Sequence, residues 1–266
     1  MNRRQAIGTV VAGALAAGLA AGCTSSHGGG PTPSPHTASV LTGRPGAAGR
    51  VLAVKIDNVG AARPQTGLND ADLVYAIEVE GGLSRLMAVY DSAHLPPVVG
   101  PVRSARETDL QLLAQYDHPA LAFSGAQSRL LPVLKKAPIV SRTGSGSFFR
   151  VSDKPAPHNE YLHTKGLTDG AGTAKDIGLR FSAATPAGGT PGTTVSVSMP
   201  AARFTFTWDG SRYRVSMDGE RSPWTADNVI VQHVTIKESR FHSRTGFVPF
   251  SQTVGQGSAV VLRDGR

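Results

Sequence analysis

The stretch Val51-Leu-Ala-Val-Lys-Ile-Asp-Asn58 decides the fold, because a mostly apolar run ends there in two polar residues. A short apolar run with polar residues at its end is typical of a buried β-strand. The segment from Asp72 to Glu80 alternates, so that Leu73 and every second residue after it share one face. Leu86 to Tyr90 follows the Gly81-Gly82 turn and is expected to return antiparallel. Together these segments predict the core of one β-sheet.

Helical signals follow the third of these strands. Ser104-Ala-Arg-Glu107 has the capping-box pattern, in which Ser104 caps a helix with Leu110 on its apolar stripe. Ala120 to Phe123 is expected to form another strand, and a second helix is expected from Gln127 to Lys136. We therefore predict an α/β fold for residues 50–187, a mixed sheet with flanking helices.

After about Gly188 the pattern becomes β-rich. The strands expected here are at residues 194–199, 203–208, 213–217, 229–237 and 259–263. Asp209-Gly210 and Asp218-Gly219 lie between them as hairpin-turn signals. Residues 188–266 are therefore expected to form a smaller, mostly antiparallel β C-terminal domain. The last strand runs into Asp264-Gly265-Arg266, a turn pattern with no partner strand after it, which predicts that this domain is truncated.

Residues 1–23 have the pattern of a lipoprotein signal peptide with a lipobox. Arg3 and Arg4 form a basic start, and an uncharged run from Ile7 to Ala21 follows, too short to span a bilayer comfortably. The small residues Ala20-Ala21-Gly22 precede Cys23, which we expect to be lipidated. An ordinary secretory signal with a stray cysteine is the alternative. Export by the general or by the twin-arginine route stays open.

Cys23 is the only cysteine in the chain, so no intramolecular disulfide can form. It is better explained as an anchor than as a ligand or a nucleophile. One acyl chain binds a membrane only marginally, which explains why the modification adds more than one chain, palmitate included. Residues 24–49, rich in Ser, Gly and Pro, predict a flexible tether. The domain is therefore expected at the outer face of the cytoplasmic membrane, outside the cytoplasm.

The formal net charge is +8, and the positive residues form no continuous run. This excess favours anionic partners, such as lipid headgroups, an acidic cell-wall polymer or an acidic envelope protein. Nucleic acid is excluded as a partner, because an exported chain without a recognition motif has no reason to meet it.

No familiar catalytic motif is present, neither a nucleophile elbow, a P-loop, a dinucleotide glycine pattern nor a zinc-binding helix. Glu78 and Glu80 lie two apart on a predicted strand, so both point to one face, where they can hold a divalent cation or act as an acid/base pair. A solvated face is the alternative. His158 lies in the rigid segment Pro155-Ala-Pro-His-Asn159, and a lone histidine is more often structural than catalytic.

Arginines gather around the predicted sheet and the first helix. Arg103 and Arg106 flank the expected helix N-terminus, where a bound anion would suit them. An internal ion pair with Glu78 or Glu80 is the alternative, and we favour it because it needs no ligand. Arg85 follows the Gly81-Gly82 turn and can neutralise one of those glutamates.

The motifs also resemble a known family, the YerB-like bacterial lipoproteins, which are built on a domain of unknown function. The residues that carry the resemblance are Ile56-Asp-Asn58, Ala62-Arg-Pro-Gln-Thr-Gly-Leu68, Ala71-Asp-Leu-Val-Tyr75, Glu78-Val-Glu-Gly-Gly82, Arg85, Gly100-Pro-Val-Arg-Ser-Ala-Arg106 and Ala156-Pro-His-Asn159. It covers residues 50–161, and more weakly residues 229–263. The resemblance implies an extracytoplasmic lipoprotein with an N-terminal α/β domain and a smaller C-terminal domain, and it brings no established activity.

The leading hypothesis is therefore a binding or accessory protein of the cell envelope, without catalysis, cofactor or structural metal, that recognises an anionic ligand. Its predicted ligand-binding residues are Asp57, Asn58, Arg63, Arg85, Arg103, Ser104, Arg106 and Asn159. The second hypothesis is an envelope hydrolase or transferase with Glu78, Glu80 and His158 as catalytic groups. The third is that the arginines and glutamates are a purely structural network of salt bridges.

Overall fold

The computed structural model describes residues 38–144, 146–185, 187–241 and 246–266. The chain divides into two units between residues 32 and 33, and every described residue belongs to the second. The expected lipidation site, Cys23, and the first part of the expected tether lie outside the described residues. Within these residues, no helix combines the length and the apolar character that a membrane span requires.

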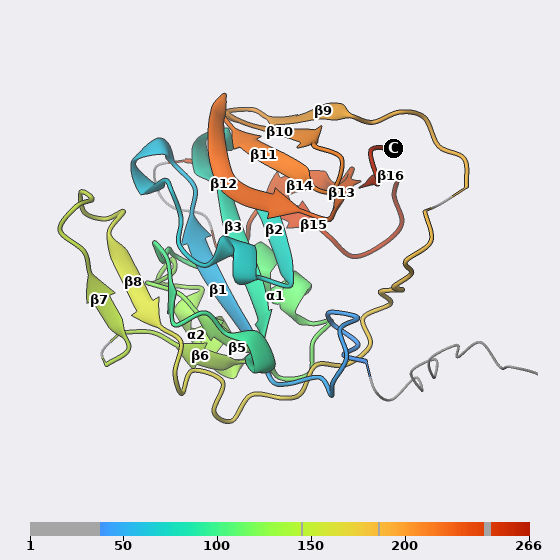
Figure 1. Ribbon diagram of the computed structural model, residues 1–266. Helices are drawn as coiled ribbons and strands as arrows, with labels where there is room; N and C mark the ends of the chain where they lie inside the picture. Colours follow the sequence, from blue (N-terminus) through green and yellow to red (C-terminus); the bar gives the residue numbers. More distant parts are fainter. Residues whose placement is uncertain (1–37, 145, 186, 242–245) are drawn as a thin grey trace, which may run out of the picture. The chain divides into compact units, whose positions relative to one another are not determined.

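A mixed five-stranded sheet forms the centre of the second unit (Figure 1). Its strands, in the spatial order β2-β3-β1-β5-β6, are β1 (Val51–Asp57), β2 (Leu73–Glu78), β3 (Ser84–Asp91), β5 (Ala120–Ala122) and β6 (Val140–Arg142). β3 pairs antiparallel with both β1 and β2, whereas β1, β5 and β6 run parallel. The first three predicted strands and the antiparallel return of β3 are therefore confirmed.

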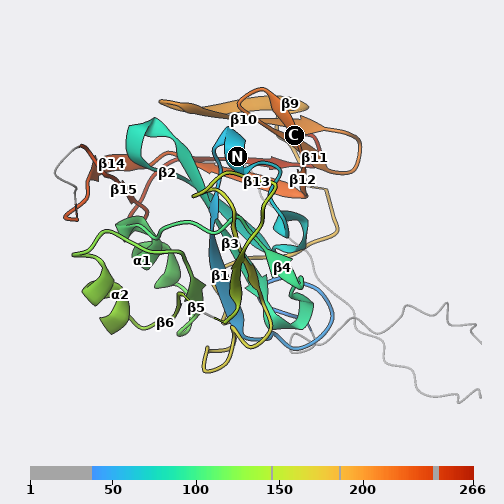
Figure 2. The ribbon, with the colours of Figure 1, turned by 90° about the vertical axis from the view of Figure 1, so that its left-hand side faces the viewer.

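Helices cover one face of this sheet. α1 (Glu107–Leu113) and α2 (Leu131–Lys136) contribute to a hydrophobic cluster that also contains Val51 of β1. In Figure 2 both helices lie to one side of β1 and β3. Because successive residues of a strand point to opposite faces, Lys55 and Asp57 share the face of Val51.

Strands from the C-terminal part cover the other face. They form a four-stranded antiparallel sheet in the order β12-β11-β10-β9, made of β9 (Thr194–Met199), β10 (Ala202–Trp208), β11 (Tyr213–Met217) and β12 (Glu220–Ala226). Phe204, Phe206 and Val215 from this sheet belong to the same hydrophobic cluster as Leu52 and Val54 of β1. The hairpin turns expected between these strands are confirmed. β1 is consequently buried along its whole length.

Short sheets and turns complete the unit. A three-stranded sheet in the order β4-β8-β7 contains β4 (Val98–Val99), β7 (Phe148–Arg150) and β8 (Glu160–His163). Two antiparallel pairs are β13 (Asn228–Gln232) with β16 (Ala259–Arg263), and β14 (Thr235–Glu238) with β15 (Pro249–Gln252). Single 3-10 turns occur at Gly60–Ala62, Leu68–Asp70, Glu80–Gly82 and Ser92–His94.

The predicted α/β class is wrong. The described residues hold sixteen strands in five sheets and two α-helices, of seven and six residues, so the fold is mostly β. α1 begins at Glu107 because Asp109, and not Ser104, caps it: the N–H of Arg106 donates to Oδ2 of Asp109 at 2.7 Å. α2 ends at Lys136 because Ala137 precedes a proline, which disfavours helical backbone.

Candidate anion-binding site

Three distant segments of the chain meet at the carboxyl end of β1. Asp57, the last residue of β1, has a side chain that is only 3% exposed. Its Oδ2 atom lies 2.9 Å from Nε of Arg103 and 2.7 Å from Nδ1 of His158. Its Oδ1 atom accepts from the N–H of Asn58 at 2.9 Å. One buried carboxylate therefore holds a guanidinium and an imidazole side by side.

Backbone hydrogen bonds fix the two segments that bring these partners. The N–H of Arg103 donates to the carbonyl of Lys55 at 2.9 Å, so that this segment continues alongside β1. The N–H of Val102 donates to the carbonyl of Glu160 at 2.6 Å, which ties the same segment to the start of β8. His158 lies two residues before β8. Backbone hydrogen bonds to β1 and to β8 therefore fix the segments that place Arg103 and His158 beside the carboxylate.

A layer of neutral polar side chains lies beside this carboxylate. Nδ2 of Asn58 donates to Oγ of Ser84 at 2.8 Å, and its Oδ1 accepts from Nε2 of Gln65 at 2.7 Å. Gln65 also donates to the carbonyl of Asp57 at 3.2 Å. All three side chains are buried. Asn58 therefore uses both of its side-chain polar atoms inside the protein.

Arg85 is the residue of β3 that pairs with Asp57 in the sheet register. It is 7% exposed, and its Nη1 donates to the carbonyl of Ser104 at 3.1 Å. Its Nε atom is buried without a hydrogen-bond partner, and no described carboxylate lies within ion-pair distance. Burial, together with the charges of Arg106 and Arg103, lowers the pKa of Arg85 to about 10, although the charges of Glu80 and Asp57 oppose that shift. Arg85 is a buried cation that forms no direct ion pair with any carboxylate in the described part of the chain.

Arg103 also retains unused donors. Its Nε atom is at ion-pair distance from Asp57, but the two atoms lack hydrogen-bond geometry. Its Nη atoms make no hydrogen bond to any described residue, and the side chain is 24% exposed. Arg85 and Arg103 therefore place unpaired guanidinium donors at the same end of β1.

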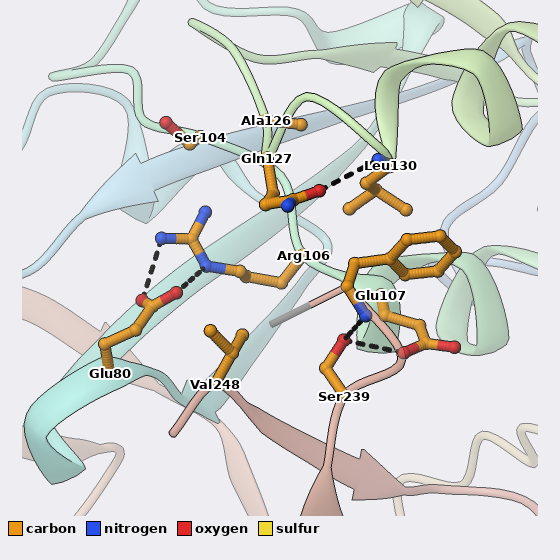
Figure 3. A pocket seen from close by; sticks show the side chains of 10 residues that line it. Glu80, Ser104, Arg106, Glu107, Ala126, Gln127, Leu130, Ser239 and Val248 are labelled. Atoms are coloured by element: carbon orange, nitrogen blue, oxygen red, sulfur yellow. Dashed lines mark hydrogen bonds and ion pairs between the residues drawn. The ribbon is translucent and has the colours of Figure 1, made fainter. Parts of the chain in front are cut away.

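Arg106, by contrast, is fully engaged. Its Nε and Nη2 atoms donate to the two carboxylate oxygens of Glu80 at 2.7 and 2.8 Å, as Figure 3 shows, and Nη1 donates to the carbonyl of Ala105. Burial raises the pKa of Glu80, but the hydrogen bonds and charge of Arg106 outweigh it and leave that pKa below its usual value. The internal ion pair that we favoured from the sequence is confirmed for Arg106, whereas Arg103 pairs with Asp57 and with neither glutamate.

The Arg106–Glu80 pair lies in the wall of a cavity of about 280 Å³ (Figure 3). The other residues that line it are Ser104, Glu107, Ala126, Gln127, Leu130, Ser239, Phe241 and Val248. Glu107 accepts from Oγ of Ser239 at 2.7 Å and from Nε of Arg240 at 2.6 Å. Because each charged lining residue has a partner, this cavity offers no free cation to an anionic ligand.

The family model described as "Protein of unknown function (DUF3048) N-terminal domain" matches residues 41–177. The chain belongs to the DUF3048 family. Asp57, Arg85, Arg103 and His158 all fall within the matched range, so the site described above lies inside the family's N-terminal domain. The resemblance that the sequence motifs indicated is confirmed.

One known protein resembles the DUF3048 chain in both sequence and structure. It is YerB of Bacillus subtilis (strain 168), whose name describes it as a lipoprotein, and it is 44% identical over 68 residues. That match covers 26% of this chain and 20% of YerB, a fifth of the relative's length. The crystal structure of YerB has a TM-score of 0.70 at 22% identity, over 86% of this chain and 84% of that one. At this identity the likeness shows the fold alone.

Arg63 of the DUF3048 chain joins the site to the C-terminal sheet. Its Nη2 donates to the carbonyl of Asn58 at 2.7 Å and to Oδ2 of Asp218 at 2.5 Å. Its Nη1 donates to the carbonyl of Met217 at 3.0 Å, and its Nε lies 3.4 Å from Oδ1 of Asn58. Arg63, which the sequence predicts to bind ligand, therefore uses its guanidinium to hold the β11–β12 turn.

Arg63→Ala is expected to lower the free energy of unfolding by about 1.5–3 kcal/mol, because hydrogen bonds to a charged group contribute about this much. Urea denaturation of the purified chain measures the change. Arg180→Ala is the matched control: its ion pair with Asp176 is exposed on both sides, and we expect almost no loss from it. A loss from Arg63→Ala no larger than the control's would show that this bridge contributes nothing.

Asn159, the last predicted ligand residue, also has internal partners. Its Nδ2 donates to the carbonyl of Val151 at 3.0 Å, and its Oδ1 accepts from Nη1 of Arg150 at 2.7 Å. These bonds tie the segment before β8 to the end of β7. Asn159 therefore shapes the loop that carries His158.

The structure shows no contact that would bring the proposed catalytic residues Glu78, Glu80 and His158 together in the described part of the chain. Among the described residues of the DUF3048 chain, no hydrogen bond or ion pair joins His158 to Glu78 or to Glu80. Partial burial raises the pKa of Glu78. The same residues contain no group of three or more His, Cys, Asp or Glu side chains placed to hold a metal ion.

Sequence reasoning missed a buried ion pair beneath the site. Nζ of Lys55 lies 2.8 Å from Oδ1 of Asp109, and neither side chain is exposed. Burial lowers the pKa of Lys55, although the charge and hydrogen bond of Asp109 oppose that shift. The signal was a lysine within an otherwise apolar strand, since a buried lysine requires a partner.

Proposed function

We propose that this chain is a lipid-anchored envelope protein whose domain binds an anionic group through Arg85 and Arg103. The observation that carries the proposal is the buried guanidinium of Arg85, whose Nε has no hydrogen-bond partner and which forms no direct ion pair with a described carboxylate. A buried charge without a direct partner is unfavourable, so a ligand that supplies a negative charge in contact with it gains free energy.

The neighbouring ion pairs support this assignment because they leave Arg85 and part of Arg103 available. The paired groups are Lys55 with Asp109, Arg63 with Asp218, Arg103 with Asp57, and Arg106 with Glu80. Of the described cations named here, Arg85 alone has no ion-pair partner, and Arg103 shares the carboxylate of Asp57 with His158 and keeps its Nη atoms free of hydrogen bonds to described residues. Planar guanidinium groups match the spacing of carboxylate and phosphate oxygens, so either group fits the site chemically.

The proposal also includes a lipid anchor at Cys23 and a location outside the cytoplasm. The signal pattern that ends at Cys23 supports lipidation, and the relative YerB is named as a lipoprotein. The domain then works at the outer face of the cytoplasmic membrane, where wall polymers, lipid headgroups and acidic proteins supply anionic groups. The full chain has a net charge of +8, and +6 remains when Arg3 and Arg4 are removed with the signal peptide, which favours the approach of such partners.

Arg103→Gln is expected to weaken the binding of inorganic phosphate by about tenfold or more, since a charge-assisted hydrogen bond contributes about 1.5–3 kcal/mol. Isothermal titration calorimetry on the full chain in detergent measures the affinity. Arg221→Gln is the matched control, because it removes an exposed positive charge from β12, which is none of the three segments that meet at Asp57, and it should bind phosphate like the wild type. Equal affinities for Arg103→Gln and wild type, or no saturable binding by the wild type, would contradict the proposal.

A further inference from the structure

The most informative contact outside the proposed binding role is the one between Asp57 and His158. We propose that His158 is an acid–base residue that acts on a phosphate ester held by Arg85 and Arg103, and that Asp57 positions its imidazole. The inference rests on the proposed anion site and goes beyond it, because it assigns a hydrolytic reaction and a class of substrate.

The geometry leaves one ring nitrogen of His158 available. A carboxylate can only accept, so Nδ1 carries the proton in the 2.7 Å contact with Oδ2 of Asp57. Nε2 makes no hydrogen bond to a described residue, and the side chain is 21% exposed. Asp57 itself is 3% exposed and is held by the N–H of Asn58. A buried carboxylate that fixes the tautomer and orientation of a partly exposed imidazole is the arrangement used for proton transfer.

The neighbouring guanidinium groups narrow the choice of substrate. Arg103 contacts the same oxygen of Asp57 as His158 does, and Arg85 is the register partner of Asp57. Of the anions that guanidinium groups recognise, a carboxylate contains no bond that water readily hydrolyses. A phosphate ester carries both the negative charge and a hydrolysable P–O bond on the same group. An imidazole that can transfer a proton, next to two guanidinium groups that bind an anion, therefore indicates a phosphate ester as the substrate.

The reaction balances with water as the only co-reactant. The oxygen of a water molecule attacks phosphorus, and Nε2 of His158 takes the proton that this water loses. The P–O bond to the alcohol breaks, and its electron pair leaves with the alcohol oxygen. The protonated imidazole then returns the proton to that oxygen, so the products are the alcohol and the phosphate with one ester bond fewer. Arg85 and Arg103 stabilise the negative charge on the phosphoryl oxygens.

The test uses the full chain in detergent with two chromogenic esters, bis(4-nitrophenyl) phosphate and 4-nitrophenyl phosphate. His158→Gln is expected to lower kcat by about 100-fold or more, the usual contribution of a general acid–base group, with KM nearly unchanged. Added imidazole should restore part of the activity of His158→Ala, which a merely structural histidine would not allow. Ester cleavage by His158→Gln at the wild-type rate, or no rescue by imidazole, overturns the assignment.

The variant Asp57→Asn tests whether Asp57 positions the imidazole of His158 or is needed only for folding. The carboxamide removes a negative charge beside Arg103, so the affinity for inorganic phosphate should rise while kcat falls by about tenfold or more. A variant that had lost its fold would lose both, and equal kcat for Asp57→Asn and wild type would overturn the positioning role.

The same measurements distinguish the two proposals. If the wild type binds phosphate through Arg103 but releases no nitrophenol from either ester above the buffer rate, the hydrolytic inference fails and the binding function stands. If the wild type does not bind phosphate in the calorimetric titration, the proposed binding function is wrong, whatever the result of the ester assay.

Discussion

Asp109→Ala is expected to lower the free energy of unfolding by about 3–5 kcal/mol, because it leaves the ammonium of Lys55 buried without a partner. Removing both charges should be far less harmful, since apolar residues of similar volume often replace a buried ion pair without loss. The double variant Lys55→Met with Asp109→Leu is therefore the matched control, and we expect it to recover most of the stability. Asp109 also accepts from the N–H of Arg106, so a small part of the loss will remain.

The loss should also depend on pH. Burial lowers the pKa of Lys55 from 10.5, so between the folded pKa and 10.5 the unfolded chain binds more protons and stability rises with pH. Without Asp109, whose charge raises that pKa, the folded lysine gives up its proton at a lower pH. The cost of Asp109→Ala should therefore shrink as the pH is raised from about 7 towards 10. Urea denaturation at several pH values measures it, and a loss below about 1 kcal/mol at pH 7 would contradict the prediction.

Arg85→Met is expected to change stability and binding in opposite directions. It removes a buried charge that has no described counterion and that lies close to Arg103 and Arg106, while the methionine fills much of the same volume. The carbonyl of Ser104 loses a donor, which offsets part of the gain. We expect the free energy of unfolding to rise by about 1 kcal/mol.

The same substitution should weaken phosphate binding by about tenfold or more, because the ligand loses its unpaired cation. Denaturation and calorimetry on one preparation measure the two effects. Arg221→Met, at an exposed position of β12, is the matched control and should change neither quantity appreciably. A variant that is less stable and binds phosphate normally would show that Arg85 is a structural residue, as the purely structural hypothesis holds.

Local signals explain which parts of the fold could be predicted from the sequence. The apolar run of β1, the alternation of β2 and the glycine turn before β3 each depend on neighbouring residues, and the sequence located all three. Both helices begin later than the sequence suggested. The first was expected to start from a Ser104 cap but begins at Glu107, where Asp109 accepts from the N–H of Arg106, and the second was expected from Gln127 but begins at Leu131.

The candidate site was predictable only in part, because its decisive contact is not local. Sequence motifs selected Asp57, Arg85, Arg103 and His158, and charge suggested an internal pair of Arg103 or Arg106 with Glu78 or Glu80, of which the structure contains Arg106 with Glu80. No periodicity connects Asp57 to a histidine 101 residues later, and the segment at Val102 and Arg103, which bonds to both β1 and Glu160, brings them together. For the same reason the sequence assigned His158 to two glutamates that it does not contact.

Because β1 shares a hydrophobic cluster with the C-terminal sheet, residues 41–177 do not form a complete core by themselves. The family's N-terminal domain, as matched over residues 41–177, completes one side of its core with Phe204, Phe206 and Val215, which lie beyond that range. Cutting the chain after residue 177 would turn the buried side of Leu52 and Val54 into open apolar surface. The range matched by the family model is thus not self-contained in its core, and β1, the strand that carries Asp57, packs against residues that the family model does not contain.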